Sequence, residues 1–241
     1  MSSVDFGLVE FDLLTTFAGV DVPFPLRVPS FGSYDVERDT LLAMACETLR
    51  RRGLADEDQP LGMAERLVAA LAEHTAAVHM SSGDRVWCAL IRRGRAVVCT
   101  QAGADDMVST RSVPTDRLAD ELAGELPALP ARRAMPLRLS VPALGRALAA
   151  SDERGVRAAV RADCPDREQA AALGEVLGEV TGHGRLGVSS CGELVGPELS
   201  WVDTEAGRLR VVADREWVSL NPLGVRELTA ALRELVAAAR R

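Results

Sequence analysis

The sequence predicts an α+β fold in which short antiparallel strands lead directly into amphipathic helices. The clearest example runs from Leu199 to Arg233, where apolar, β-branched segments are separated by turn residues and followed by a helical pattern. In that helix, Val225, Leu228 and Leu232 recur at intervals of three and four residues, which places them on one face. The stretch from Arg85 to Leu126 shows the same order of strands and then a helix. We therefore expect the chain to be organised around an antiparallel sheet.

The same landmarks predict a quasi-twofold internal repeat. Pro25-Leu26-Arg27-Val28 precedes the first group of helices, and Pro136-Leu137-Arg138-Leu139 precedes the second group 111 residues later. Pro114 and Pro222, which open the two closing helices, are 108 residues apart. We interpret residues 1–130 and 131–241 as diverged halves, each with helices, a strand meander and a closing helix, that share one sheet as a single compact domain. Chance similarity of two α+β segments is the alternative, because short proline motifs are common.

The first half should contain an extended entry, helices and four strands. Val4 to Phe17 is apolar and partly alternating, and it fits either a strand or a short helix. Val22 to Ser30 contains three prolines, which fix φ and favour extended geometry. The remaining elements are expected as a helix over 35–52, a second helix after Pro60 through Leu71 or Glu73, strands at 76–82, 85–92, 95–101 and 107–113, and a helix after Pro114.

The second half should begin with a stiff linker that contains Pro127, Pro130 and Pro136. Further elements are expected as a helical region over 140–161 that breaks near Ser151 or Gly155, a helix over 166–180, and strands from Arg185 onward, including 199–203, 208–213 and 216–220. Asn221 is a suitable N-cap for the last helix. Pro222 suits its first turn, because the missing N–H of proline would have no partner there.

Composition narrows the function classes. Every one of the 28 basic residues is arginine, which is typical of a GC-rich bacterial genome. The net charge of −7 and the isoelectric point near 5.1 argue against a nucleic-acid partner, whose phosphates require a basic surface. No apolar run approaches the roughly 20 residues needed to cross a bilayer, and the N-terminal segment is acidic where a signal peptide would be basic. We therefore expect a cytoplasmic protein without membrane insertion.

No residue pattern demands catalysis, so we expect no enzyme and no catalytic, cofactor-binding or metal-binding residues. Gly182 to Gly187 matches G-x-G-x-x-G, but it follows a predicted helix and precedes a strand, the reverse of a dinucleotide site, and is expected to be a flexible turn. His74 and His79 lack a neighbouring cysteine pair for zinc. The five scattered cysteines are expected to be reduced core residues. A small enzyme that uses Cys191 with His183 stays an alternative.

Several short motifs, taken in order and with their spacing, resemble the EspG family. Near the N-terminus they are Phe24-Pro25-Leu26-Arg27-Val28-Pro29-Ser30 and the helix end Leu49-Arg50-Arg51-Arg52-Gly53-Leu54. Near the C-terminus they are Trp201-Val202-Asp203-Thr204, Gly207-Arg208, Trp217-Val218 and Asn221-Pro222. The similarity extends from about Phe11 to Arg233.

This resemblance implies a central antiparallel sheet flanked by helical bundles. It also implies a cytoplasmic, non-enzymatic chaperone of an actinobacterial type VII (ESX) secretion system. Such a chaperone would bind a helical secreted protein, a PE–PPE-like or WXG100-like heterodimer, by its hydrophobic tip and keep it soluble for protein transport. A weak homodimer stays open, and a dimeric regulatory protein-binding module is the competing function.

The partner is expected to bind the exposed sheet face of the second half, with Trp201, Arg208, Arg210 and Trp217 as contact residues. Alternation along the strand puts Arg208 and Arg210 on one face, opposite Leu209. Tryptophan and arginine contribute much of the binding energy at protein interfaces. The alternative is that both tryptophans are buried beneath helices, since tryptophan is highly buried on average.

Overall fold

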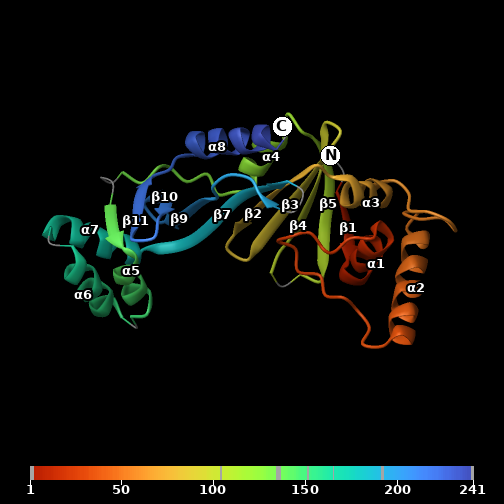
Figure 1. Ribbon diagram of the computed structural model, residues 1–241, viewed down its shortest axis with the longest axis horizontal. Coiled ribbons are helices and arrows are strands. Elements are labelled where there is room, and N and C mark those ends of the chain that lie inside the picture. The colour runs from red at the N-terminus through yellow and green to blue at the C-terminus, as the bar shows by residue number, and fades with distance from the viewer. Residues whose placement is uncertain are drawn as a thin grey trace. The chain divides into compact units, whose positions relative to one another are not determined.

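Among the residues that the structure describes, the chain forms eight helices and eleven strands (Figure 1). This content confirms the predicted α+β class. The structure is a computed structural model, and it describes residues 3–103, 105–133, 137–150, 152–164, 166–190 and 193–239. Hydrogen bonds connect the strands in the order β1-β5-β4-β3-β2-β7-β9-β10-β11-β6, with β8 paired to β7.

Contacts group the chain into two compact units. Unit 1 comprises Met1–Leu122, Leu186–Pro197 and Arg233–Arg241, and unit 2 comprises Ala123–Arg185 and Glu198–Leu232. These boundaries differ from the predicted halves, because two later stretches of the chain group with the first unit. The division into halves 1–130 and 131–241 that form a single domain therefore stays a prediction.

Unit 1 contains an antiparallel sheet in the order β1-β5-β4-β3-β2. Its strands are β1 (Val4–Gly7), β2 (Ala76–Ser82), β3 (Arg85–Arg92), β4 (Arg95–Gln101) and β5 (Met107–Pro114). The four strands predicted between 76 and 113 are thus confirmed to within a residue. The segment that fitted either a strand or a helix is both, since β1 leads directly into helix α1 (Leu8–Ala18).

Helices α1, α2 (Asp35–Arg51) and α3 (Met63–Glu73) lie beside this sheet, and α4 (Leu118–Gly124) follows it (Figure 1). One core joins α1 and α3 to a single sheet face through Phe11, Leu67, Cys88, Leu90 and Val97, all of them buried. Helix α2 follows its predicted span and buries little beyond Ala45 and Leu49. Acidic residues in its first turn and arginines in its last turn complement the helix dipole.

The proline-rich entry forms neither a helix nor a strand, but it is not extended throughout as predicted. It turns at Phe24 and Pro25, where the Leu26 N–H donates to the Pro23 carbonyl at 3.1 Å. Polar side chains hold the segment in place. The Gln101 carboxamide accepts a hydrogen bond from the Arg27 backbone N–H at 2.7 Å and donates one to the Arg27 carbonyl at 3.0 Å. Further along, the Asp12 carboxylate binds Arg38 at 2.9 Å and accepts from the Phe31 N–H at 3.0 Å. These contacts supply partners for a backbone that has no strand neighbour.

Unit 2 contains a second antiparallel meander. Its strands are β6 (Leu137–Ser140), the first part of β7 (Val180–Ser190), β9 (Leu199–Thr204), β10 (Gly207–Ala213) and β11 (Trp217–Pro222). The end of β7, from Leu186, and β8 (Glu193–Leu194) group with unit 1. The prediction that Pro114 opens a helix is wrong, because Pro114 ends β5 opposite Arg95. Two further local predictions, both in unit 2, are also wrong. Gly182 to Gly187 is part of β7 and not a turn, and Asn221 and Pro222 end β11, where they pair with Arg210 and Leu209. Helix α8 (Val225–Ala238) therefore begins three residues after the predicted start.

Helices α5 (Val141–Leu148), α6 (Glu153–Asp163) and α7 (Arg167–Gly178) gather beside the strands of unit 2 (Figure 1). The predicted break between 140 and 161 is confirmed, since α5 and α6 are separate. Each helix begins at a side-chain cap: Ser140, Asp152 and Asp166 accept hydrogen bonds from backbone N–H groups in the first turn. Ser151, Pro136 and Cys191 lie outside the described residues.

A buried ion pair fixes the β9–β10 hairpin. The Arg208 guanidinium is completely buried and binds the Asp203 carboxylate through two hydrogen bonds, of 2.6 and 3.1 Å. The linker packs directly against it, because the Arg208 N–H donates to the Pro130 carbonyl at 2.8 Å and the Arg132 N–H donates to the Arg208 carbonyl at 3.1 Å. The neighbouring Gly207 has a φ of +131°, and a Cβ there would lie 2.5 Å from the Pro130 oxygen, so only glycine fits.

Removing one partner of this ion pair should destabilise the protein strongly. Arg208→Ala leaves a buried, uncompensated carboxylate, and we expect it to lower the free energy of unfolding by about 3–5 kcal/mol. Arg210→Ala is the matched control, since Arg210 is exposed two residues further along the same strand, and it should change that free energy by about 0.5 kcal/mol or less. Urea denaturation measures both; equal losses would contradict this account.

Candidate partner-binding surface

The four residues predicted to contact a partner lie on one face of the unit 2 sheet. Arg208 is directly opposite Asp203, and Arg210 is directly opposite Trp201, in the β9–β10 pairing. Residues two apart in a strand share a face, so Arg208, Arg210 and Trp201 are on the same side. The β10–β11 register places Trp217 on that side as well. Helices α5 to α7 cover the opposite face, where Leu209, Val218 and Leu220 are core residues.

The structure divides the four residues into two buried and two accessible side chains. Trp201 and Arg208 are 1% and 0% exposed, so neither reaches the surface in this structure. The Arg208 guanidinium lies 5.5 Å from the centre of the Trp201 ring, beside Asp203. Arg210 is exposed and Trp217 is half-buried. The burial of Trp201 agrees with the alternative that this tryptophan is a core residue. Arg208 is buried because it forms an ion pair with Asp203.

We define the open face as Arg138, Arg210, Val212, Trp217 and Ser219. Alternation and register put these five residues on the side of the sheet away from α5, α6 and α7. All are exposed or half-buried, and Val212 is 45% exposed. The open face combines an aromatic ring, an aliphatic side chain and two guanidinium groups. This mixture suits a protein contact, because aromatic residues and arginine are enriched at interfaces.

Arg138 is a residue that the sequence reasoning missed. Its guanidinium lies 4.5 Å from the centre of the Trp217 ring, within the range of a cation–π interaction. The contact arises because β6 pairs with β11, with Arg138 opposite Ser219 and Ser140 opposite Trp217. The alternating Leu137-Arg138-Leu139 pattern was a signal for a strand with Arg138 on its polar side. The partner strand, however, is about 80 residues further along the chain.

The turn before β11 holds Trp217 in position. The Asp214 carboxylate accepts hydrogen bonds from the backbone N–H groups of Glu216, at 2.8 Å, and Trp217, at 2.7 Å. These two hydrogen bonds, with a smaller contribution from the Arg138 charge, lower the pKa of Asp214. The backbone of Trp217 is therefore fixed although its ring is partly in solvent.

The helix-covered side of unit 2 contains an apolar cavity of about 320 Å³. Its lining includes Leu139, Leu173, Val211 and Leu220, together with His183. No carboxylate or cysteine is among the residues that line it. Cys191, the proposed partner of His183 in the enzyme alternative, lies outside the described residues, so the structure does not test that pair.

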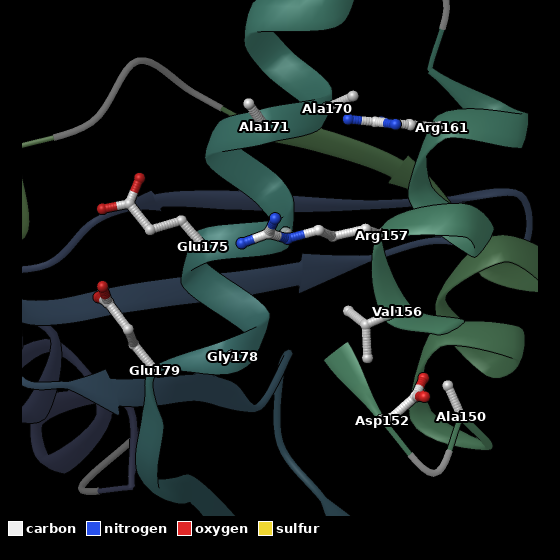
Figure 2. A pocket seen from close by; sticks show the side chains of 11 residues that line it. Ala150, Asp152, Val156, Arg157, Arg161, Ala170, Ala171, Glu175, Gly178 and Glu179 are labelled. Carbon is white, nitrogen blue, oxygen red and sulfur yellow. The ribbon is translucent and has the colours of Figure 1, made fainter. Parts of the chain in front are cut away.

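A larger, polar cleft of about 850 Å³ lies between α6 and α7 (Figure 2). Arg157 reaches from α6 across to α7, where a Cβ on Gly174 would lie 3.3 Å from the Arg157 Cγ. Glu175 and Glu179 point away from Arg157, and both bind Arg132. No serine, cysteine or histidine is among the residues that line the cleft. Its lining consists of charged groups and small or aliphatic side chains.

The described residues hold no group of three or more histidine, cysteine, aspartate or glutamate side chains placed to bind a metal ion. None of the helices described is both long and apolar enough to span a bilayer.

Comparison with known proteins identifies relatives. Residues 8–234 match the model of the EspG family. The fold is similar to that of the type VII secretion system chaperone EspG5 of Mycobacterium tuberculosis, solved in complex with a PE25–PPE41 dimer, with a TM-score of 0.69 and 11% sequence identity. The likeness covers 98% of this chain and 96% of that one, and at this identity it concerns the fold. No curated protein matches the sequence.

Fluorescence quenching of tryptophan tests whether Trp201 is buried and Trp217 is accessible to solvent. Trp87 and Trp201 are 2% and 1% exposed, whereas Trp217 is half-buried, so iodide should quench mainly the Trp217 fluorescence. We expect Trp217→Phe to remove most of the quenchable emission and Trp201→Phe to leave it in place. Stern–Volmer titrations of the two variants make the measurement. Loss of the quenchable emission in Trp201→Phe would show that Trp201 is at the surface.

The Asp214 turn should make a pH-dependent contribution to stability. The folded pKa is below the ordinary value of 3.8, so the ionised carboxylate stabilises the protein above that pH. This stabilisation is lost as the pH falls through the folded pKa. Asp214→Asn should therefore be less stable than the parent at pH ~7, with a smaller difference at pH ~3. Urea denaturation at both pH values measures this; a constant difference would contradict it.

Proposed function

Since this chain belongs to the EspG family, we propose that it is a non-enzymatic chaperone of a type VII (ESX) secretion system that acts in the cytoplasm. It binds a helical secreted protein, a PE–PPE-like heterodimer, by the apolar tip and keeps it soluble until secretion. The observation that carries this proposal is the family match, which covers residues 8–234. The shared fold with EspG5, a chaperone solved with a PE25–PPE41 dimer, supports it.

We propose that the partner contacts the open face of unit 2. A helical tip with exposed apolar side chains would aggregate in water, and a surface that covers it must offer apolar area of its own. Trp217 and Val212 supply that area on the open face. Arg138 and Arg210 flank them and keep the uncomplexed surface polar. Trp201 and Arg208 are buried on the same sheet face and support the open face indirectly. The Arg208–Asp203 ion pair fixes the hairpin that carries Arg210, and Trp201 lies directly opposite Arg210.

The chemistry of the open face favours binding over catalysis. It presents a tryptophan, a valine, a serine and two arginines, with no acid–base pair among the five residues that define it. Trp217 is held by its turn and by the Arg138 stack, so little side-chain freedom is lost on binding. Preorganised aromatic and arginine side chains are the usual source of binding energy at protein interfaces.

We also propose that the two meanders descend from a repeated unit. Strands β2 to β5 are followed by helix α4, and strands β9 to β11 are followed by helix α8, which supports residues 1–130 and 131–241 as diverged halves of one domain with helical bundles at its flanks. Superposition of the Cα atoms of β3–β5 and α4 on those of β9–β11 and α8 provides the check. Failure of the strands to match in order would contradict the repeat.

The binding proposal is tested by affinity capture from the native cytosol followed by variants of the open face. We expect a helical secreted protein to co-purify with the unmodified chain. Trp217→Ala should weaken that complex by about 2 kcal/mol or more, and Arg210→Ala should also weaken it. Both variants should remain folded.

Arg226→Ala is the matched control, because Arg226 is an exposed arginine of α8 and is not one of the five residues that define the open face. It should retain full co-purification. If Trp217→Ala and Arg210→Ala also retain it, the open face is not the binding site. Size-exclusion chromatography of the free protein separates this function from a dimeric regulatory module, which would elute as a stable dimer.

A further inference from the structure

A strongly basic groove lies in unit 1, between α3 and the hairpin that joins β3 to β4. We define the basic groove as Arg66, Arg92, Arg93 and Arg95 around a floor that includes Leu90 and Val97. Its volume is about 530 Å³. This concentration of arginine stands out in a chain whose net charge is −7.

The fold brings these residues together from two elements. In the β3–β4 pairing, Arg92 is directly opposite Arg95 and Leu90 is directly opposite Val97, so all four lie on the same sheet face. Arg66 is on α3, which packs on that face. The groove therefore has an apolar floor of strand residues and a rim of guanidinium groups from both the helix and the hairpin.

The negative groups near the groove only partly balance it. Glu73 binds Arg92 at 2.5 Å and lies 3.6 Å from Arg93. Glu65, on the rim, is the acidic side chain among the residues that line the groove. Four arginines against these two glutamates leave an excess of two positive charges. Arg95 meets a neutral partner, since its Nε donates to the Ser112 hydroxyl at 3.0 Å.

Two features of the β3–β4 hairpin that carries these arginines are locally unfavourable. Like charges directly opposite each other across antiparallel strands are destabilising, and Arg92 and Arg95 form such a pair. Arg93 has a φ of +48°, in the left-handed region that favours glycine or asparagine. Natural sequences break local rules mainly at functional sites. Both exceptions fall on the groove, which points to a role in binding an anion.

We propose that the basic groove binds an acidic segment of a partner protein. Carboxylates of the segment pair with Arg66, Arg93 and Arg95, whose side chains are all exposed. Guanidinium groups bind carboxylates in a bidentate manner, which gives direction as well as attraction. Because the arginines are spread over a helix and a hairpin around a groove of about 530 Å³, an extended ligand fits better than a single phosphate. This inference does not depend on the proposed function, whose surface is in unit 2.

Fluorescence anisotropy with a short labelled peptide tests the proposal on the full-length chain. The probe contains glutamate, alanine and leucine, and its control has every glutamate replaced by glutamine. We expect the acidic peptide to bind and the glutamine peptide to bind at least about tenfold more weakly, because charged hydrogen bonds are lost. Added sodium chloride should raise the Kd of the acidic peptide.

Charge reversal locates the binding. Arg66→Glu with Arg93→Glu should raise the Kd at least about tenfold, since attraction becomes repulsion. Arg51→Glu is the matched control, because Arg51 is an exposed arginine of the same unit outside the groove, and it should leave the Kd nearly unchanged. Circular dichroism confirms folding, and Arg93→Gln replaces the double variant if that variant unfolds.

Three results would overturn the proposal. Equal binding of the acidic and glutamine peptides would mean that the arginines do not recognise carboxylates. An equal loss in Arg51→Glu would show non-specific attraction to any arginine. Displacement of the peptide by inorganic phosphate, where chloride at the same ionic strength fails, would assign the groove to a small anion instead of a protein segment.

Discussion

The ion pair between Arg208 and Asp203 is the interaction on which the arrangement of the second unit depends. It closes the β9–β10 hairpin, and the same arginine binds the linker through its backbone and, at 3.4 Å, through its side chain to the Pro127 carbonyl. Arg132 continues the network, since it hydrogen-bonds Glu179, the C-cap of α7, and Thr204 on β9. Linker, hairpin and helix α7 are thus joined by two arginines that are both less than a tenth exposed.

This network also explains why residues on one face of the unit 2 sheet differ in their exposure to solvent. Near Arg208 the linker approaches so closely that Gly207 must lack a side chain, and the sheet face is covered there. Two residues further along, Arg210 is exposed, and Val212 and Trp217 are reachable by solvent. Partly covered sheet faces are common in α+β proteins, because one face needs burial to form the core and the other can remain polar.

The two surfaces proposed for binding differ in chemistry. The open face pairs a tryptophan ring with arginines, and its apolar area suits a partner that must bury apolar side chains. The basic groove in unit 1 is dominated by charge, and its apolar part is confined to the floor. A chaperone for secretion has to recognise its substrate and then release it. Electrostatic contacts give specificity and fast association, while apolar contacts give most of the affinity. The two kinds of surface would therefore contribute different properties to one protein.

Local sequence determined the elements and their order. Hydrophobic period and turn residues predicted strands β2 to β5 to within a residue, and the spans of α2 and α7 to within two residues. Short motifs in a fixed order indicated the family that the comparison bears out. Tertiary structure decided what local patterns do not encode. Gly182 to Gly187 is a strand because neighbouring strands supply hydrogen-bond partners, and Pro222 extends β11 because Leu209 lies opposite it. Trp201 and Trp217 carry the same side chain on the same sheet face. One is buried and the other is not, because the covering of a face depends on segments distant in sequence, which alternation along a strand cannot specify.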